Sequence, residues 1–257
     1  MLPFIQNRLK NAAFEVQEYV RLVGAAMHGV FTKPRYGHDI VEQFDVIGVG
    51  SLTVVVLTGF FTGAALCSQT GLTLDQFGAR PIVGRIVSAS MIKELGPVLT
   101  ALMLTGRIGS GIAAELGSMV VTDQINALRA LGTDPIRKLV VPRVLAGVLM
   151  APVLTVISDF AAIVGGWLVA RFQLQVATGV YWSSVIYTLY PQDLWMGLIK
   201  PFVLGFAIVT IACHVGLRTS GGTQGVGQAT TISVVAGSVA VIAADFFVTQ
   251  VLIALLY

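Results

Sequence analysis

Charged side chains interrupt long apolar stretches of this sequence, and they are the residues whose chemistry stands out first. A charge in a hydrocarbon environment is costly, so such residues pair with one another or mark a binding site. Arg107 lies deepest, and a carboxylate on another helix, Asp159 or Asp245, would neutralise it. We favour a structural role for these three residues over contact with a substrate. The charged residues within apolar stretches are Lys93, Glu94, Arg107, Glu115, Asp159 and Asp245.

Motifs for catalysis or cofactor binding are missing from the sequence. Ser110 has only His214 as a distant candidate base, with no motif around either residue. The glycine-rich segment 221–227, GGTQGVG, lacks the Lys-Ser/Thr pair of a phosphate-binding loop. Cys67 and Cys213 have neither CxxC spacing nor a histidine at ligand spacing. We therefore expect no catalytic residue, metal or cofactor in this chain, and any ATP and Mg would bind a partner.

The composition is that of a membrane protein. Of the 257 residues, 55% are hydrophobic and 11% charged, whereas a soluble domain has about 25% charged residues. The mean hydropathy is +0.84. Apolar runs approach the roughly 20 residues that cross a bilayer, which predicts an all-α integral membrane protein with five spans. The predicted spans are residues 44–66, 93–117, 142–170, 195–216 and 229–256.

Three further segments are too polar or too mixed to cross. In residues 1–31, apolar side chains recur at helical spacing from Ile5 to Met27, which predicts an amphipathic helix in the membrane interface. A helix packed on a soluble partner is the alternative. Residues 118–138 predict a short amphipathic helix outside the bilayer, and residues 67–92 predict a turn with a short interfacial or re-entrant piece.

Glycines in the first predicted span permit close approach of another helix. Gly59 and Gly63 form a G-x-x-x-G pair, a weak motif because glycine is frequent in membrane helices. The partner helix lies either in the same chain or in a second copy.

The basic residues indicate the orientation. A cytoplasmic N-terminus places ten of the 16 Lys and Arg residues in inner segments, the asymmetry expected of inner loops. This predicts a periplasmic C-terminus and a cytoplasmic segment 118–138, and it accounts for the net charge of +3 without nucleic acid. The inner basic residues are Arg8, Lys10, Arg21, Lys33, Arg35, Arg129, Arg137, Lys138, Arg143 and Arg218.

The densest group of motifs lies between Glu94 and Gly147. It comprises Glu94-Leu95-Gly96-Pro97, Gly106-Arg107, Ala114-Glu115-Leu116-Gly117, Thr122-Asp123-Gln124-Ile125, Leu131-Gly132-Thr133-Asp134-Pro135 and Pro142-Arg143. In these motifs the sequence resembles the MlaE (YrbE, TGD1-like) family, the permease subunits of MCE-type ABC lipid transporters. The likeness continues through Ala229-Thr230-Thr231, so residues 1–257 would form a single permease domain.

The resemblance implies a fold and a set of partners. The fold would be similar to the membrane domains of the G and A classes of ABC exporters, with two copies forming a homodimer in the bacterial inner membrane. Two ABC ATPase subunits would bind this dimer, and the assembly would move phospholipid or a related lipid. The family usually works with an extracytoplasmic MCE-domain protein and often with a small STAS-like subunit.

The resemblance also assigns site residues. Segment 118–138 becomes the helix that couples to the ATPase, with Asp123, Gln124, Asn126 and Arg129 as its contact residues. The lipid would bind near the dimer axis in a cavity lined by Lys93, Glu94, Leu66, Leu72, Leu74 and Leu95. Relatives often have arginine at the position of Lys93, and lysine keeps the charge but cannot bind phosphate in a bidentate manner.

Two other functions are compatible with the sequence. An ABC importer permease for a small solute also has a cytoplasmic loop with an Ala-Leu-Gly run, although Asn126 stands where that loop would have glutamate. A membrane scaffold or lipid-binding protein that uses no ATP is the third possibility. A co-purifying ATPase would separate transport from scaffolding, and a bound two-tailed lipid would separate lipid from polar solute.

Overall fold

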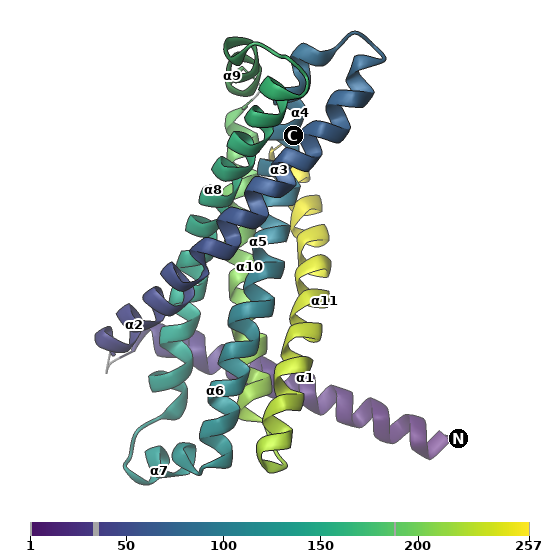
Figure 1. Ribbon diagram of the computed structural model, residues 1–257. Coiled ribbons are helices and arrows are strands. Elements are labelled where there is room, and N and C mark those ends of the chain that lie inside the picture. The colour runs from purple at the N-terminus through teal and green to yellow at the C-terminus, as the bar shows by residue number, and fades with distance from the viewer. Residues whose placement is uncertain (1, 33–35, 188, 257) are drawn as a thin grey trace.

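A computed structural model describes residues 2–32, 36–187 and 189–256 (Figure 1). All regular elements in these ranges are helices, and five helical segments are long and apolar enough to cross a membrane. This confirms the predicted all-α membrane fold, which follows from the medium because lipid offers no partner to backbone N–H and C=O groups. The spans are Gly37–Asp75, Arg80–Val121, Ile136–Phe172, Pro191–Leu217 and Gly222–Leu256.

Several spans are interrupted by tighter or wider helical turns. The 3₁₀ turns are η1 and η2, and the π-helical turns are η3, η4 and η5, a rare geometry that often marks functional sites. The elements in chain order are α1 (Leu2–Phe31), α2 (Gly37–Ile47), η1 (Val49–Ser51), α3 (Leu52–Asp75), η2 (Arg80–Ile82), α4 (Val83–Ser90), η3 (Met91–Leu95), α5 (Gly96–Leu104), η4 (Thr105–Gly109), α6 (Ser110–Val121), α7 (Gln124–Ala130), η5 (Ile136–Val140), α8 (Val141–Phe172), α9 (Thr178–Ile186), α10 (Pro191–Leu217) and α11 (Gly222–Leu256).

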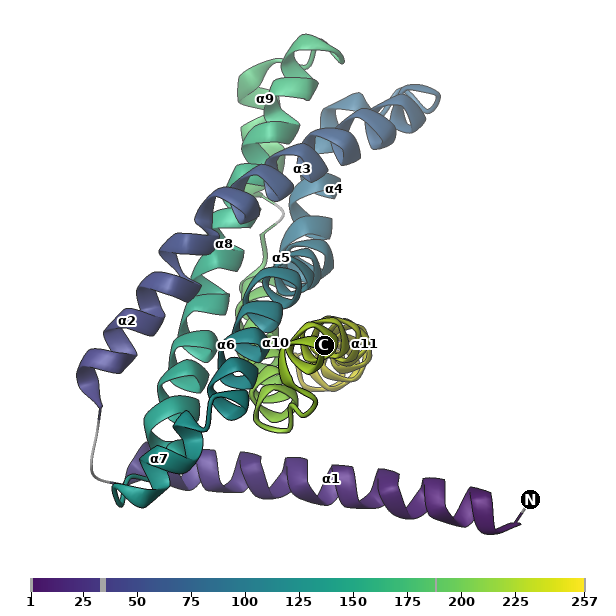
Figure 2. The ribbon, with the colours of Figure 1, turned by 60° about the horizontal axis from the view of Figure 1, so that its bottom comes forward.

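Helix α1 lies across one end of the bundle, which we call the base (Figures 1 and 2). Helix α7 lies at the same end, whereas α9 and the C-terminal end of α11 lie at the opposite end (Figure 1). One face of α1 packs on the bundle: Tyr19 Oη and Thr210 Oγ1 are 2.8 Å apart, and Ala26 is buried. Another face carries exposed Val16 and Val20, so part of the predicted apolar stripe remains open.

Two apolar clusters form the core, one in the base half of the bundle and one in the opposite half. The second cluster surrounds Tyr181 of α9, whose hydroxyl donates to the Ile163 carbonyl at 3.0 Å. Among the five spans, those that contain α8 and α10 are the most buried, whereas those that contain α3 and α11 are the least buried. The bundle therefore has a closed centre and two spans with broad open apolar faces.

Glycines bring α3 and α8 into backbone contact. A Cβ atom on Gly63 would overlap the Ala162 carbonyl, and one on Gly59 would lie 2.5 Å from the Ser158 carbonyl oxygen. From the other side, a Cβ on Gly165 would overlap the Phe60 carbonyl. Of the two uses considered for the Gly59/Gly63 pair, the structure shows the contact within the chain.

The boundary between the first two spans differs from the one that the sequence predicted. Helix α3 continues to Asp75, and the second span is helical from Arg80, so the turn is much shorter than the predicted segment 67–92. Apolar side chains of the extended part explain this, because Val83 and Val87 are fully buried against α8 and α9. Segment 118–138 does contain a short helix, α7.

The α3–α8 seam gives a first prediction. Gly63→Ala should destabilise the fold by about 1–3 kcal/mol, because the added methyl group forces two backbones apart. Gly111→Ala is the matched control: Gly111 lies in α6 with open space around its Cα, so the same change should be neutral or slightly stabilising. Unfolding of both variants in one detergent measures the difference in stability. Equal stability of the two variants would contradict the close backbone contact of α3 and α8 at Gly63.

Candidate functional site

A cluster of charges lies inside the spans, centred on Lys200. This residue of α10 is fully buried, and its Nζ lies 2.6 Å from Glu94 Oε2 of η3 and 3.3 Å from Asp245 Oδ1 of α11. Thr249 of α11 also donates to Glu94 Oε1, at 3.4 Å. Three spans therefore share one ammonium group and two carboxylates, and the carboxylates compensate the buried ammonium charge, which water cannot reach.

Local sequence explains why Lys200 reaches this position. Pro97 has no N–H to donate to the Lys93 carbonyl four residues earlier, and Lys200 Nζ donates to that carbonyl at 2.8 Å. Gly197, one turn before Lys200, lets α10 approach η3, because a Cβ there would lie 2.5 Å from the Ile92 carbonyl oxygen. The π-helical turn η3 thus offers a carbonyl and a carboxylate to the same ammonium group.

Lys93 forms a second ion pair beside the first. Its Nζ lies 2.7 Å from Asp193 Oδ1, and Asp193 is buried in the first turn of α10, where a carboxylate also suits the helix dipole. The Lys93 side chain stays 33% exposed and that of Glu94 43% exposed. Both residues of η3 therefore combine a buried partner with an accessible side.

The expected pairing of Arg107 with Asp159 or Asp245 is wrong. Arg107 donates to Ser51 Oγ at 2.7 Å and to the Val46 carbonyl at 3.3 Å, because α2 ends at Ile47 and leaves acceptors at its last turn. Asp245 pairs with Lys200 instead. Asp159 is buried against Gly96, where its Oδ1 has no hydrogen-bond partner among the described atoms.

A third ion pair ties the helices on either side of α7. Arg143 of α8 is 3% exposed, and its Nη2 lies 2.7 Å from Glu115 Oε1 of α6 while its Nη1 donates to the Leu139 carbonyl at 2.6 Å. Both helices lead directly into the segment that holds α7 (Figure 1). A displacement of α7 would therefore move α6 and α8 together.

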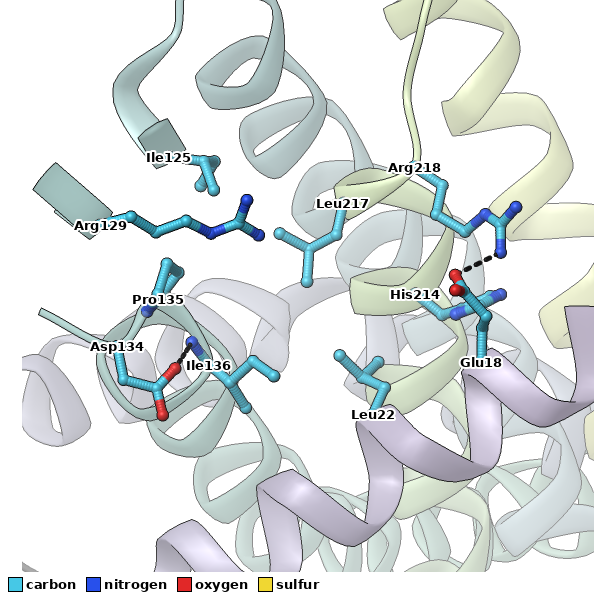
Figure 3. A pocket seen from close by; sticks show the side chains of 10 residues that line it. All are labelled: Glu18, Leu22, Ile125, Arg129, Asp134, Pro135, Ile136, His214, Leu217 and Arg218. Carbon is cyan, nitrogen blue, oxygen red and sulfur yellow. Dashed lines mark hydrogen bonds and ion pairs between the residues drawn. The ribbon is translucent and has the colours of Figure 1, made fainter. Parts of the chain in front are cut away.

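The predicted contact residues of α7 have two different environments. Asp123, Gln124 and Asn126 are exposed at the start of the helix, where Asn126 donates to Asp123 Oδ1 at 2.9 Å. Arg129 extends instead toward Leu217 across a pocket of about 260 Å³ between α1, α7 and α10 (Figure 3). The other lining residues include Glu18, Ile125, Asp134, His214 and Arg218.

Ion pairs on the α1 side close this base pocket. Arg218 Nη1 lies 2.7 Å from Glu18 Oε2, which Figure 3 shows at the pocket edge, and Arg218 Nη2 lies 2.9 Å from Glu15 Oε1. Glu15 Oε2 also lies 3.5 Å from His214 Nε2. These contacts fasten α1 to the end of α10 and so fix one wall of the pocket.

The structure places three of the six predicted lipid-binding residues in one turn and the other three along α3. Lys93, Glu94 and Leu95 belong to one turn, η3, while Leu66 and Leu74 of α3 pack against the same apolar cluster as Leu95. Leu72 is 58% exposed on α3. Lys93, Glu94 and Leu95 therefore share one turn, whereas Leu66, Leu72 and Leu74 lie along α3, with Leu72 the most exposed of the three.

Sequence reasoning missed three residues that the structure makes prominent. Lys200 and Asp193 complete the ion pairs of η3. Lys200 could have been found from the sequence, because it is a charged residue inside the predicted span 195–216. Leu131, just after α7, is 80% exposed at the base, an unusual position for a large apolar side chain. The sequence could have indicated Leu131, because it is an apolar residue directly before Gly132 in a polar segment.

Comparisons with known proteins agree in pointing to permeases. A family model described as Permease MlaE matches residues 40–251. A probable ABC transporter permease protein of Rickettsia felis is 40% identical over 226 residues, which cover 88% of this chain and 87% of that protein. The intermembrane phospholipid transport system permease protein MlaE of Haemophilus influenzae is 36% identical over 256 residues, 96% of this chain and 98% of that protein.

A plant relative extends the likeness beyond bacteria. The protein TRIGALACTOSYLDIACYLGLYCEROL 1, chloroplastic, of Arabidopsis thaliana is 35% identical over 212 residues, which cover 82% of this chain and 61% of the plant protein. The charged residues of η3 and the segment of α7 lie within the range matched by the family model.

The charged cluster predicts a large effect at Lys200. Lys200→Met should destabilise the fold by about 3–5 kcal/mol, because it leaves two carboxylates without their counterion. Adding Glu94→Gln and Asp245→Asn to it should recover most of that loss. The control is Lys138→Met, which removes an exposed pair with Asp39 and should cost at most about 1 kcal/mol. Unfolding of each variant in one detergent tests this, and wild-type stability of Lys200→Met would refute it.

The position of Arg107 predicts a pattern of coupling. Arg107→Gln should cost about 1–2 kcal/mol through its lost hydrogen bonds. In double-mutant cycles it should couple to Ser51→Ala and be additive with Asp159→Asn to within about 0.5 kcal/mol. Unfolding free energies of the single and double variants provide the measurement. Coupling to Asp159 would instead support the ion pair that the sequence suggested.

Proposed function

Because the chain belongs to the MlaE permease family, we propose that it is the membrane-spanning subunit of an ATP-driven phospholipid transporter in the bacterial inner membrane. Family membership makes it a transporter subunit rather than an enzyme. ATP and Mg would bind a separate ABC ATPase, which fits a sequence without a phosphate-binding loop.

The observation that carries this proposal is a partly exposed charged cluster set among apolar spans. Lys93 and Glu94 keep accessible sides while their partners Asp193 and Lys200 are buried. The neighbouring α11 presents exposed apolar side chains, including Phe246 next to Asp245. A two-tailed lipid needs apolar walls for its tails and a few polar groups for its headgroup. In this proposal, Leu66, Leu72, Leu74 and Leu95 contact the tails.

A homodimer would complete the site. The apolar faces of α3 and α11 are the least buried among the spans, and a second copy would cover part of them. The lipid cavity then lies between two copies, with Lys93 and Glu94 of each chain near its wall. An importer permease for a polar solute would need a polar lining instead.

The arrangement of charges supports a cytoplasmic base. Lys10, Arg21, Arg129, Arg137 and Arg218 belong to segments at that end, as the positive-inside rule requires (Figure 1). The C-terminus then faces the periplasm, where an MCE-domain partner would receive or deliver lipid at the end that holds α9. A STAS-like subunit, where present, would bind on the cytoplasmic side.

Helix α7 is the proposed coupling helix. Asp123, Gln124 and Asn126 offer polar contacts, and exposed Leu131 offers an apolar side chain that a partner could bury. The Glu115–Arg143 pair would transmit movement of α7 to α6 and α8 as one rigid unit.

The test of the function is native mass spectrometry of the complex purified through this chain, followed by lipid extraction. Two copies with two ATPase subunits and bound phospholipid are expected. ATPase without lipid would favour a solute importer, and absence of any ATPase would favour a scaffold.

Coupling through α7 predicts a selective loss of the ATPase. Leu131→Asp should reduce co-purification of the ATPase about tenfold or more, since burial of a leucine side chain contributes about 1.5–3 kcal/mol. Phe172→Asp is the matched control, because Phe172 is 78% exposed at the opposite end of α8. Both variants should unfold like the wild type. Retention of the ATPase by Leu131→Asp would rule out this residue as an anchor.

A further inference from the structure

A groove on the outer surface of the bundle is separate from both the charged cluster and the base pocket. Helices α1, α8 and α10 form it, and it encloses about 410 Å³. Its lining side chains are all apolar. They include Met27 and Phe31 of α1, Val144 and Val148 of α8, and Val203 and Phe206 of α10. We call it the lateral groove.

The lateral groove lies in the membrane-spanning part of the chain. Val144 and Val148 belong to the first turns of α8, and Val203 and Phe206 to the middle of α10, both within spans. The surroundings at such positions are acyl chains, and a water molecule there would find no polar partner. An open groove with this lining therefore suits hydrocarbon rather than water.

Helix α1 gives the groove a polar neighbour. Val16, Val20, Met27 and Phe31 are exposed along one face of α1, and this face continues into the groove. At 100° per residue, Arg21 and His28 fall on the adjoining flank, and both are exposed. Arg21 precedes the groove-lining residues Met27 and Phe31 along α1, and Figure 1 shows that α1 rises from its N-terminal end toward its C-terminal end. A basic amphipathic helix in the membrane interface contacts acyl chains with its apolar face and lipid headgroups with its basic residues.

We infer that the lateral groove binds one acyl chain of an anionic phospholipid from the leaflet on the base side, with the lipid phosphate beside Arg21 and His28. Arg21 supplies the charge that distinguishes an anionic from a zwitterionic headgroup. A second copy of the chain is a weaker occupant, because α3 and α11 carry broader open faces and neither lines the groove. This site does not depend on the proposed transport function, since it requires only that the chain spans a membrane.

Photo-crosslinking tests the site. The complex, purified through the full chain, is reconstituted in phosphatidylcholine vesicles that contain a small fraction of phosphatidylglycerol with a diazirine on one acyl chain. After irradiation, mass spectrometry locates the adducts. Adducts should concentrate at residues 144–148 and 202–206, several-fold above those around Val153 and Val156, which are exposed on α8 outside the groove. Equal labelling of both regions would mean unspecific contact with lipid and would overturn the site.

Two pairs of variants test acyl-chain binding and headgroup recognition separately. Val203→Trp fills the groove and should remove its adducts, whereas Val156→Trp should leave them unchanged. Arg21→Gln should remove the preference for phosphatidylglycerol over a phosphatidylcholine probe, whereas Arg171→Gln, at the opposite end, should retain it. Adducts that persist in Val203→Trp, or an unchanged preference in Arg21→Gln, would refute the corresponding half of the proposal.

Discussion

The buried ammonium group of Lys200 is the constraint on which the packing of α10 and α11 against η3 depends. An isolated charge is not tolerated among acyl chains, so two carboxylates from different spans must stay within contact of it. This requirement fixes α10 and α11 against η3. It also explains local features that would otherwise be costly, namely a π-helical turn, a proline after it, and a glycine on the facing helix.

The same cluster connects stability with function. Glu94 is held by Lys200 on one side and remains accessible on the other, and Lys93 has the same relation to Asp193. A headgroup that approached these side chains would compete with, or add to, existing ion pairs. Lipid binding would thereby bias the relative position of three spans, and a ligand shifts conformational equilibria only through such differential contacts.

At the base of the bundle, ion pairs hold helix α1 in place. There the ion pairs of Arg218 with Glu15 and Glu18 are partly exposed, and they fasten helix α1 to the end of α10. The Glu115–Arg143 pair, in which the arginine is buried, joins the two spans that flank α7. In the proposed assembly, spans attached to this exposed helix would transmit movement between the partner that binds α7 and the membrane.

The amino-acid sequence by itself determined the class of protein, the number of spans, the helix of residues 1–31 and the short polar helix within 118–138. These features follow from composition and from helical periodicity, which are local properties of the chain. It also placed Lys93 and Glu94 among the residues of interest. Only the tertiary structure decided which charges meet: Arg107 contacts a helix end rather than an acid, and Asp245 pairs with Lys200. Pairing depends on the rotation and axial position of one helix against another, which glycines and π-helical turns set at sites distant in sequence, so no local pattern encodes it.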